Sequence, residues 1–201
     1  MLRVAGAEAI TEVEGPGRRF ALWVQGCSRQ CSGCCNPHMH DQTAGRLVEE
    51  REMAIEIIKA KADGLTIVGG EPLEQIESLN QMFDCLDELE YDKSIMLFTG
   101  FPWSDVCDDS RIMAFLQRCD VVVAGPFMQD LAPDRRRWIG SSNQTVHFFR
   151  NRLDFLRENW PQHRVEIEIH ISDGQLSING FPVGDDHEFE KIFAAGRKVC
   201  R

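Results

Sequence analysis

The chain lacks any run of about 18 consecutive apolar residues, so we expect no membrane-spanning helix. Its first residues, MLRVAGAEAITEVEG, contain no long apolar segment and carry acidic side chains, which is not the pattern of a secretory signal. Basic residues are also scarce, because 22 Lys and Arg stand against 32 Asp and Glu, giving a formal net charge of −10. This balance argues against non-specific nucleic-acid binding, which needs a basic surface. Internal repeats and low-complexity segments are lacking too.

Cysteine, by contrast, is plentiful, with 8 residues in a chain of 201. The length suits one domain with a substantial core, and a hydrophobic content of 43% with 27% charged residues is ordinary for a globular protein. Eight cysteines in an exported chain would suggest disulfides. Because no export signal precedes them and they cluster like metal ligands, we expect the protein in the reducing cytoplasm.

Four of the cysteines fall within one short segment, CSRQCSGCC. Three of them have the spacing Cys27-x3-Cys31-x2-Cys34, and a tight loop with these gaps can direct three thiolates at one centre. Thiolates select zinc, copper(I) or iron–sulfur clusters over harder cations. A structural zinc site usually has four protein ligands, whereas a cubane cluster held by three thiolates leaves one iron open to a substrate. The spacing therefore favours a catalytic iron–sulfur cluster.

Apolar segments that read as buried strands alternate with amphipathic helices up to about residue 125. The expected strands cover residues 20–24, 65–68, 95–98 and 121–123. The expected helices run from Leu47 to Ala62, from Ile76 to Leu86, and from an N-cap at Ser110 to Leu116. This alternation predicts an α/β fold with a parallel sheet and crossover helices.

Glycine-containing turns follow these strands at Gly69, Thr99-Gly100 and Gly125, and the cysteine loop follows the first strand. Ligands of parallel α/β folds bind at the carboxyl ends of the strands. We therefore expect the cysteine loop and the three turns to share one face of the sheet.

The rest of the chain carries weaker signals. We expect residues 128–144 to form a polar loop, in which Arg135 to Arg137 are more typical of a solvated charge run than of an anion site. The elements expected after it are a strand at 145–149, a short helix at 153–160, a hairpin of strands 164–171 and 175–181 around Ser172-Asp173-Gly174, and a helix at 185–195. We divide the chain into a domain of residues 1–154 and a C-terminal extension of residues 155–201.

Several motifs together resemble the radical S-adenosylmethionine (SAM) superfamily, and within it the activating enzymes of anaerobic ribonucleotide reductase. They run in order over roughly residues 15–150: Gly15-Pro16-Gly17, the segment LWVQGCSRQCSGCCN, Gly69-Gly70-Glu71-Pro72, Phe98-Thr99-Gly100, Gly125-Pro126-Phe127 and the segment WIGSSNQ. The cysteine spacing is specific to the superfamily, and the ordered set indicates the subfamily. The resemblance implies an incomplete (β/α) barrel, followed here by the hairpin and helix of the extension.

The resemblance also implies the site. Cys27, Cys31 and Cys34 would hold a [4Fe–4S] cluster, and Cys35 would be a non-ligand facing the SAM pocket. Gly33 stands where many radical SAM enzymes have an aromatic residue, and the ribonucleotide reductase activases share the glycine. The full set of SAM-binding residues expected is Gly33, Cys34, Cys35, Gly69, Gly70, Glu71 and Thr99.

In that family, a flavodoxin or ferredoxin reduces the cluster, and SAM is cleaved to methionine and a 5′-deoxyadenosyl radical. The radical takes hydrogen from a glycine of a partner reductase. On this reading Gly70 leaves room for the ligand. A bulky residue at position 70 is therefore expected to weaken SAM binding while the cluster stays in place.

Two other functions stay open from the residues. The first is a radical SAM enzyme that modifies another peptide or a small molecule, with the hairpin as its recognition element. The second is an electron-transfer or zinc-binding module without SAM chemistry, in which His38 and His40 would join the thiolates, although two loop histidines are more often solvated. Asn143 and Gln144 match the family without an evident contact. The remaining cysteines, expected to be core or surface thiols, are Cys85, Cys107, Cys119 and Cys200.

Overall fold

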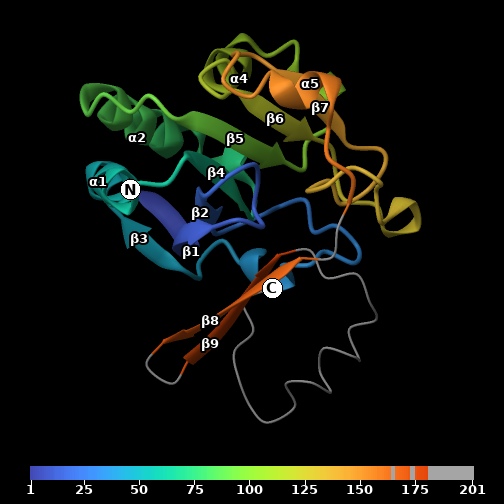
Figure 1. Ribbon diagram of the computed structural model, residues 1–201, viewed down its shortest axis with the longest axis horizontal. Coiled ribbons are helices and arrows are strands. Elements are labelled where there is room, and N and C mark those ends of the chain that lie inside the picture. Colours follow the sequence, from blue (N-terminus) through green and yellow to red (C-terminus); the bar gives the residue numbers. More distant parts are fainter. Residues whose placement is uncertain (164–165, 173–174, 181–201) are drawn as a thin grey trace.

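The computed structural model describes residues 1–163, 166–172 and 175–180. Seven strands form one mixed sheet in the order β3-β1-β2-β4-β5-β6-β7 (Figure 1). Its four central strands are parallel: β2 (Arg19–Val24), β4 (Gly64–Gly69), β5 (Ser94–Thr99) and β6 (Val121–Ala124). The flanking strands β1 (Leu2–Thr11), β3 (Arg46–Val48) and β7 (Thr145–Phe148) are antiparallel to their neighbours. The structure therefore confirms an α/β fold with a parallel sheet at its centre.

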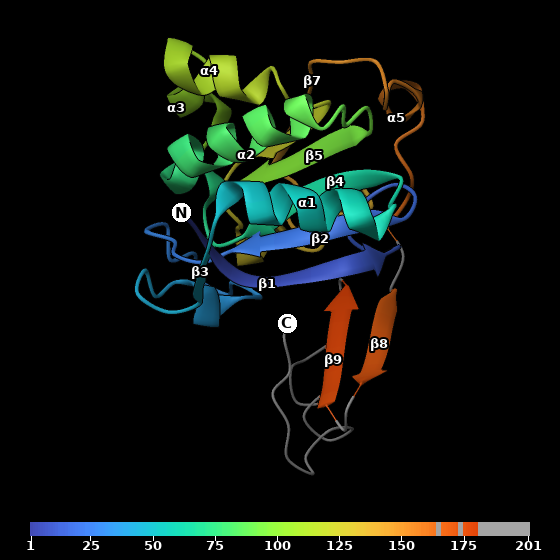
Figure 2. The same cartoon turned by 90° about the vertical axis from the view of Figure 1, so that its left-hand side faces the viewer.

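Helices cover one face of this sheet. They are α1 (Glu50–Ala60), α2 (Ile76–Glu88), α3 (Trp103–Val106) and α4 (Ser110–Leu116), whereas the short α5 (Phe155–Glu158) packs on the opposite face through Leu156. Figure 2 shows α1 and α2 side by side over the sheet. Their apolar residues pack on every second side chain of the strands, such as Leu22, Ile67 and Leu97, and form the main core. No helix in the described part of the chain has both the length and the apolar character needed to cross a membrane.

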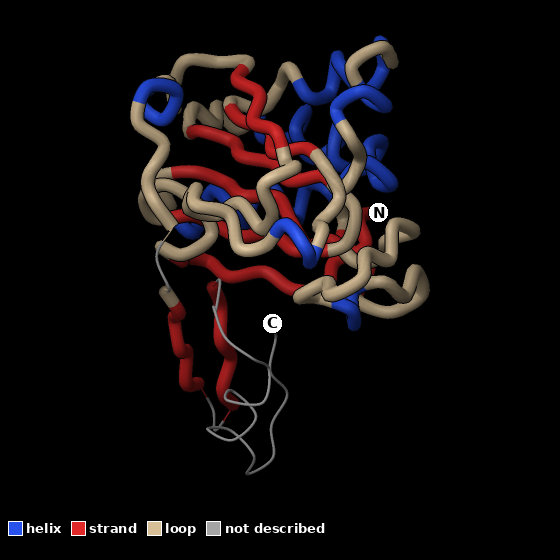
Figure 3. Tube along the Cα trace, turned by 90° about the vertical axis from the view of Figure 1, so that its right-hand side faces the viewer, coloured by secondary structure: helices blue, strands red, loops and turns tan. Residues whose placement is uncertain are grey.

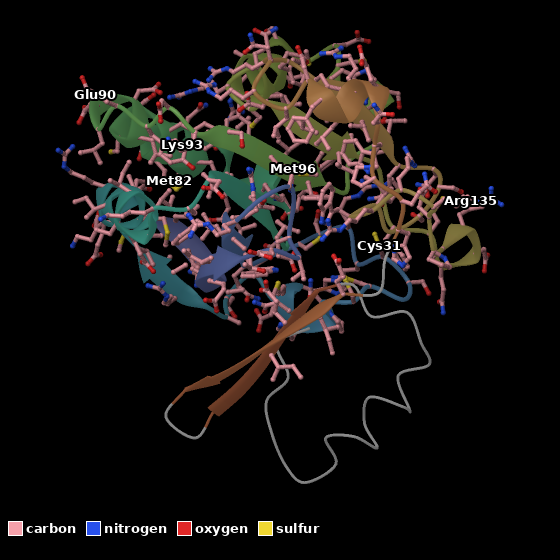
Figure 4. All side chains as sticks on the ribbon, viewed as in Figure 1. Cys31, Met82, Glu90, Lys93, Met96 and Arg135 are labelled. Carbon is pink, nitrogen blue, oxygen red and sulfur yellow. The ribbon has the colours of Figure 1, made fainter. Side chains whose placement is uncertain are left out.

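The opposite face of the sheet carries the alternate side chains, including Met96, Val121 and Val123. Here β5 to β7 are covered by the segment that follows β6, through Trp138 and Ile139. Figure 4 shows Met96 near the middle of the molecule. Near the carboxyl ends of the strands this face is less covered, because Trp23 of β2 and Val68 of β4 are only half-buried.

Several sequence-based assignments were wrong, and strand pairing or helix capping explains each difference. Strand β1 was missed because its centre, Ala5 to Ala9, lacks β-branched and aromatic residues; it forms by pairing with β2. Leu47 was expected on a helix but pairs with β1 as part of β3. Asp109, not Ser110, caps α4, because its carboxylate accepts the amide hydrogens of Arg111 and Ile112.

The last expected strand of the domain exists as β7, but it is antiparallel to β6 and so does not continue the parallel barrel pattern. The helix expected over 153–160 is limited to α5. The 3-10 helices η1 (Pro37–Met39), η2 (Pro72–Gln75) and η3 (Gln129–Leu131) lie in the connecting loops.

The expected C-terminal hairpin is confirmed as β8 (Ile167–Ser172) paired with β9 (Gln175–Gly180). Figures 1 and 2 show it standing apart from the main sheet. Residues 173–174 of its turn and the expected helix at 185–195 lie outside the described residues.

The base of the hairpin contacts the segment that follows β1. Glu168 accepts the amide hydrogen of Glu12 at 2.6 Å, and Arg137 forms an ion pair with Glu166. Glu14 is buried beneath the hairpin, where the backbone of Gly180 hydrogen-bonds its carboxylate. Burial nevertheless raises the pKa of Glu14 to about 7, and the nearby charge of Glu168 adds to this shift.

Candidate functional site

The loops named by the sequence motifs meet at one edge of the sheet. Val24 pairs with Gly69, and Thr99 pairs with Ala124, so β2, β4, β5 and β6 all end at the same level. Figure 3 looks onto the side toward which the arrowheads of β5 and β6 point in Figure 1, and loops cross this side. The expectation that the cysteine loop and the three glycine turns share a face is confirmed.

The cysteine loop begins at the end of β2, and its last residues lie beside its first residues. The amide of Gly26 donates to the carbonyl of Met39 at 2.9 Å, and the amide of Cys27 donates to that of His40 at 3.2 Å. Gln25 is buried, and its amide nitrogen donates to the carbonyls of His38 and Asp41. These bonds fix both ends of the loop, as the predicted site with three ligands on one segment would require.

The segment after β4 forms a clamp on the cysteine loop, and we call residues 69–75 the clamp. The amide of Gly70 donates to the carbonyl of Val24, and the amide of Glu71 donates to that of Gly26, both at 2.8 Å. A Cβ at position 70 would lie 2.8 Å from the carbonyl carbon of Gly26, and closer still to its oxygen. Gly70 is therefore required by the backbone that precedes Cys27. The sequence alone predicted that a larger residue would leave the cluster in place; this contact instead predicts that it would disturb the cysteine loop, and both stay predictions.

Two further clamp residues hold the loop, and sequence reasoning missed both. Glu74 accepts the amide hydrogen of Ser28 at 2.9 Å and also accepts from its hydroxyl. Gln75 donates to the carbonyl of Gln25 and accepts from the amide of Arg3. The signal in the sequence is weak: two polar residues, Glu74 and Gln75, follow Pro72-Leu73 on a short helix that begins soon after a strand end.

Glu71 joins the ends of β4 and β5. Its fully buried carboxylate accepts hydrogen bonds from the amide of Leu73 at 2.9 Å, the hydroxyl of Thr99 at 2.7 Å and the amide of Gly100 at 2.7 Å. Burial raises the pKa of Glu71 to about 7, although these three donors favour the charged form. The contacts of the Glu71 and Thr99 side chains in the described residues are thus internal, and a direct role of either in SAM binding stays a prediction.

Backbone amides lie close to the sulfurs of two loop cysteines, Cys27 and Cys34. The amides of Arg29 and Gln30 face the Cys27 thiol, and the amide of Asn36 lies 3.4 Å from the sulfur of Cys34. Burial raises the pKa of both thiols, and these amides oppose the rise by favouring the thiolate. Amide hydrogens directed at thiolates are also what tunes an iron–sulfur cluster.

The four loop cysteines differ in exposure. Cys27 is buried, Cys31 and Cys34 are half-buried, and Cys35 is exposed. Figure 4 shows Cys31 on the loop that leaves β2. Of the other cysteines, Cys119 is buried and Cys85 and Cys107 are half-buried, whereas Cys200 lies outside the described residues.

Among the residues that the structure describes, no three His, Cys, Asp or Glu side chains gather closely enough to hold a single metal ion. His38 is exposed, and the ring Nε2 of half-buried His40 has no hydrogen-bond partner, so the zinc alternative with these histidines stays a prediction. A cubane cluster is a different case, because each of its thiolates binds a different iron atom and the sulfurs need not surround one ion.

Gly33 approaches the loop that contains η3. Its φ is +73°, and a Cβ at this position would lie 2.8 Å from the side-chain oxygen of Gln129. The positive φ disfavours a side chain here, whereas the exposed Gln129 side chain can rotate away. The backbone conformation is a reason internal to the chain for glycine at a position where an aromatic residue is common in the superfamily.

Asn143 and Gln144 support the turn after β6. Asn143 donates to the carbonyl of Pro126 at 2.8 Å, and Gln144 donates to that of Gly125 at 2.9 Å. The side-chain oxygen of Gln144 accepts the amides of Gly140 and Ser141, whereas that of Asn143 is buried without a partner. The side-chain oxygen of Asn143 is thus an unsatisfied hydrogen-bond acceptor beside the turn that follows β6.

The face of the sheet opposite the helices is partly open near this edge. Trp23 and Val68 are paired in register, and Phe98 has the same orientation on β5; all three are half-buried. Their counterparts on the helix face, such as Leu22, are fully buried. An apolar surface therefore lies beside the cysteine loop.

The three consecutive arginines do not form the solvated run that we expected. Arg136 pairs with Asp134 and also donates to the carbonyl of Gln144, which stabilises the loop after β6. Arg137 pairs with Glu166 of the hairpin, so only Arg135 is exposed, at the outer margin of the molecule (Figure 4).

Comparison with known proteins agrees with this geometry. A family model described as "4Fe-4S single cluster domain" matches residues 13–147. The chain is 35% identical over 147 residues to the protein named "Anaerobic ribonucleoside-triphosphate reductase-activating protein" of Vibrio cholerae, with 70% of this chain and 94% of the relative aligned. Proteins of the same name from Haemophilus influenzae and Enterobacteria phage T4 are 32% and 31% identical, with 69% and 67% of this chain and 92% and 86% of the relatives aligned. The β8–β9 hairpin lies beyond the residues matched by the family model.

Proposed function

Because this chain belongs to the family of anaerobic ribonucleoside-triphosphate reductase-activating proteins and contains their 4Fe-4S single cluster domain, we propose that it is a radical SAM activase. It forms a glycyl radical on an anaerobic ribonucleotide reductase. The observation that carries this proposal is the cysteine loop, which the clamp holds at the carboxyl edge of the parallel strands.

The donor set fits a [4Fe–4S] cluster. Cys27, Cys31 and Cys34 are soft thiol ligands on one loop, and backbone amides near two of the sulfurs favour the thiolate. Three thiolates leave the fourth position of the cluster to the substrate. When bound, the cluster supplies one electron to the sulfonium of SAM, which is then cleaved to methionine and a 5′-deoxyadenosyl radical.

The chain's own residues bind and orient SAM and exclude water. The backbone at Gly69 and Gly70 lies next to the cysteine loop and is the site for the amino group of SAM. The half-buried Trp23, Val68 and Phe98 provide an apolar surface for the adenosine part. The unsatisfied Asn143 oxygen offers an acceptor for a ligand N–H group.

The arrangement of strands and helices also supports a more specific description of the fold. The parallel strands β2, β4, β5 and β6, with helices on one face, form part of an incomplete (β/α) barrel whose other face holds SAM. The site lies at an exposed edge where loops meet, and this suits a macromolecular substrate that closes it. A flavodoxin or ferredoxin in the cytoplasm supplies the electron.

The β8–β9 hairpin favours one second candidate, a radical SAM enzyme that modifies another peptide. The hairpin lies beyond the family match and presents half-exposed Ile167 and Ile169. An apolar strand of this kind can bind a peptide by edge pairing. The two candidates share the cluster and SAM and differ only in the partner.

The first test is the cluster. After anaerobic reconstitution the protein should contain about four irons and four sulfides per chain. Replacing Cys27, Cys31 or Cys34 by Ala should remove most of the iron, while the matched Cys35→Ala variant should retain it. Stoichiometric zinc without acid-labile sulfide, in protein purified anaerobically with iron supplied, would contradict the proposal.

The second test is the reaction. The reduced protein should release 5′-deoxyadenosine and methionine from SAM, and electron paramagnetic resonance should detect a glycyl radical on anaerobic ribonucleotide reductase mixed with it. SAM cleavage without a radical on that reductase would favour the second candidate. A cluster-loaded and reduced sample that neither binds nor cleaves SAM would rule out both.

A further inference from the structure

Arg29 extends from the cysteine loop across the edge of the sheet to the turn after β5. It lies two residues after Cys27, and its guanidinium carbon is 4.8 Å from the centre of the Phe101 ring. The absence of a side chain at Gly100 makes room for it, because a Cβ there would be 3.3 Å from the Arg29 Cγ. A cation stacked on an aromatic ring in this way is held in one orientation.

The charge of Arg29 has no partner among the described residues. No carboxylate forms an ion pair with it, and its Nε is buried without a hydrogen bond. The other arginines near the site, Arg136 and Arg137, each pair with a carboxylate. In a chain with a net charge of −10, a half-buried and unpaired guanidinium is unusual and costly.

Two carboxylates, Glu71 and Glu74, also lie along this edge, but both are committed elsewhere, Glu74 to Ser28 and Gln42. The Oε2 of Glu71 would lie 3.3 Å from a Cβ at Gly100, so Glu71 approaches the same glycine as Arg29. Both Glu71 oxygens accept hydrogen bonds from the clamp and from the start of the β5 turn, and neither binds Arg29. The unused donors of Arg29 are therefore available for an anion from outside the chain.

We propose that Arg29 binds the carboxylate of the methionine part of SAM and so positions the ligand at the cluster, an inference that rests on the proposed function. SAM has a single anionic group, the α-carboxylate. A guanidinium binds a carboxylate through two parallel hydrogen bonds, and such charge-assisted bonds are about twice as strong as neutral ones. Arg29 is on the same loop as the cluster ligands and next to the clamp, so one contact sets the distance of SAM from both.

The test compares two ligands on three cluster-loaded proteins. Dissociation constants are measured by equilibrium dialysis for SAM and for decarboxylated SAM, which lacks only the carboxylate. The proteins are the unchanged chain, Arg29→Gln, and Arg135→Gln as a control that removes an exposed arginine with no ion pair. Arg29→Gln should weaken SAM binding about 10- to 100-fold and leave decarboxylated SAM within about twofold. Arg135→Gln should change neither.

Iron content and the cluster's electron paramagnetic resonance spectrum are recorded for every sample, so that a lost cluster is not mistaken for lost affinity. If Arg29→Gln does not retain iron, Arg29→Lys and Phe101→Leu carry the test. Lysine keeps the charge without the two-pronged geometry, and leucine removes the ring under the guanidinium while leaving the cysteine loop unchanged. Each should lower the preference for SAM over decarboxylated SAM at least threefold, by weakening a charge-assisted contact.

The outcomes separate this inference from the proposed function. If the unchanged protein binds no SAM, the proposed function fails. If it binds SAM and the Arg29 variants keep both the affinity and the preference for the carboxylate, only the role of Arg29 is refuted. Equal losses for the two ligands would also refute it, because a general disturbance of the pocket does not depend on the carboxylate.

Discussion

The clamp makes a strong prediction for Gly70→Ala. The added Cβ would lie 2.8 Å from the carbonyl carbon and 3.0 Å from the amide nitrogen of Gly26, and both atoms belong to buried backbone. Neither neighbour is a flexible side chain that can rotate away. The backbone after β2 must therefore move, and it carries Cys27 with it.

The cost has two parts. Forcing an extra methyl group into a packed site costs about 1–3 kcal/mol. The movement also strains the hydrogen bonds from Gly70 to Val24 and from Glu71 to Gly26, each contributing about 0.5–1.5 kcal/mol. A total of about 2–6 kcal/mol corresponds to a melting temperature lower by about 4–24 °C for a chain of this size.

The assay is thermal unfolding of the iron-free protein, together with iron and sulfide analysis after reconstitution. Gly6→Ala is the matched control, because a Cβ at position 6 has no atom within 4 Å. This control should be neutral or stabilising by up to about 1 kcal/mol. Gly70→Ala should lower both the melting temperature and the iron content. A Gly70→Ala variant with normal stability and full iron would refute the clamp as the support of the cysteine loop.

Two further predictions concern buried carboxylates. Glu71→Gln should destabilise the protein by about 1–3 kcal/mol in thermal unfolding, because the new amide group faces the Gly100 N–H, which loses its acceptor. The control Glu77→Gln removes one partner of an exposed ion pair and should cost less than about 1 kcal/mol. Equal effects of the two substitutions would contradict this prediction. Burial raises the pKa of Glu14 from its ordinary value of 4.5 to about 7, so the folded protein favours the neutral carboxyl. This contribution to the free energy of unfolding is complete below about pH 4.5 and is lost as the pH rises through 7, a decrease of about 3 kcal/mol. Urea unfolding from pH 4.5 to 8 should therefore show a smaller loss of stability in Glu14→Gln than in the unchanged protein, and parallel curves would count against a buried Glu14.

Much of the fold was predictable because its signals are local. Each parallel strand is a short apolar run with a glycine at or shortly after its end. This pattern depends only on residues that are close in sequence, so it indicates a strand without knowledge of the rest of the fold. The edge strand β1 was not predictable, because alanine, glycine and glutamate have little tendency to form strands and the pairing with β2 decides its structure. The same applies to Leu47, whose place on β3 depends on β1.

The candidate site shows the same division. The spacing of Cys27, Cys31 and Cys34 along the chain was enough by itself to predict a set of three thiolate ligands, since three thiols so close in sequence can share one loop. Only the tertiary structure decided what supports that loop. Glu74 binds Ser28 across 46 positions of sequence, and the need for glycine at position 70 comes from the backbone of Gly26. A sequence pattern records which residues are neighbours along the chain, whereas these contacts exist only after two parallel strands have aligned their ends.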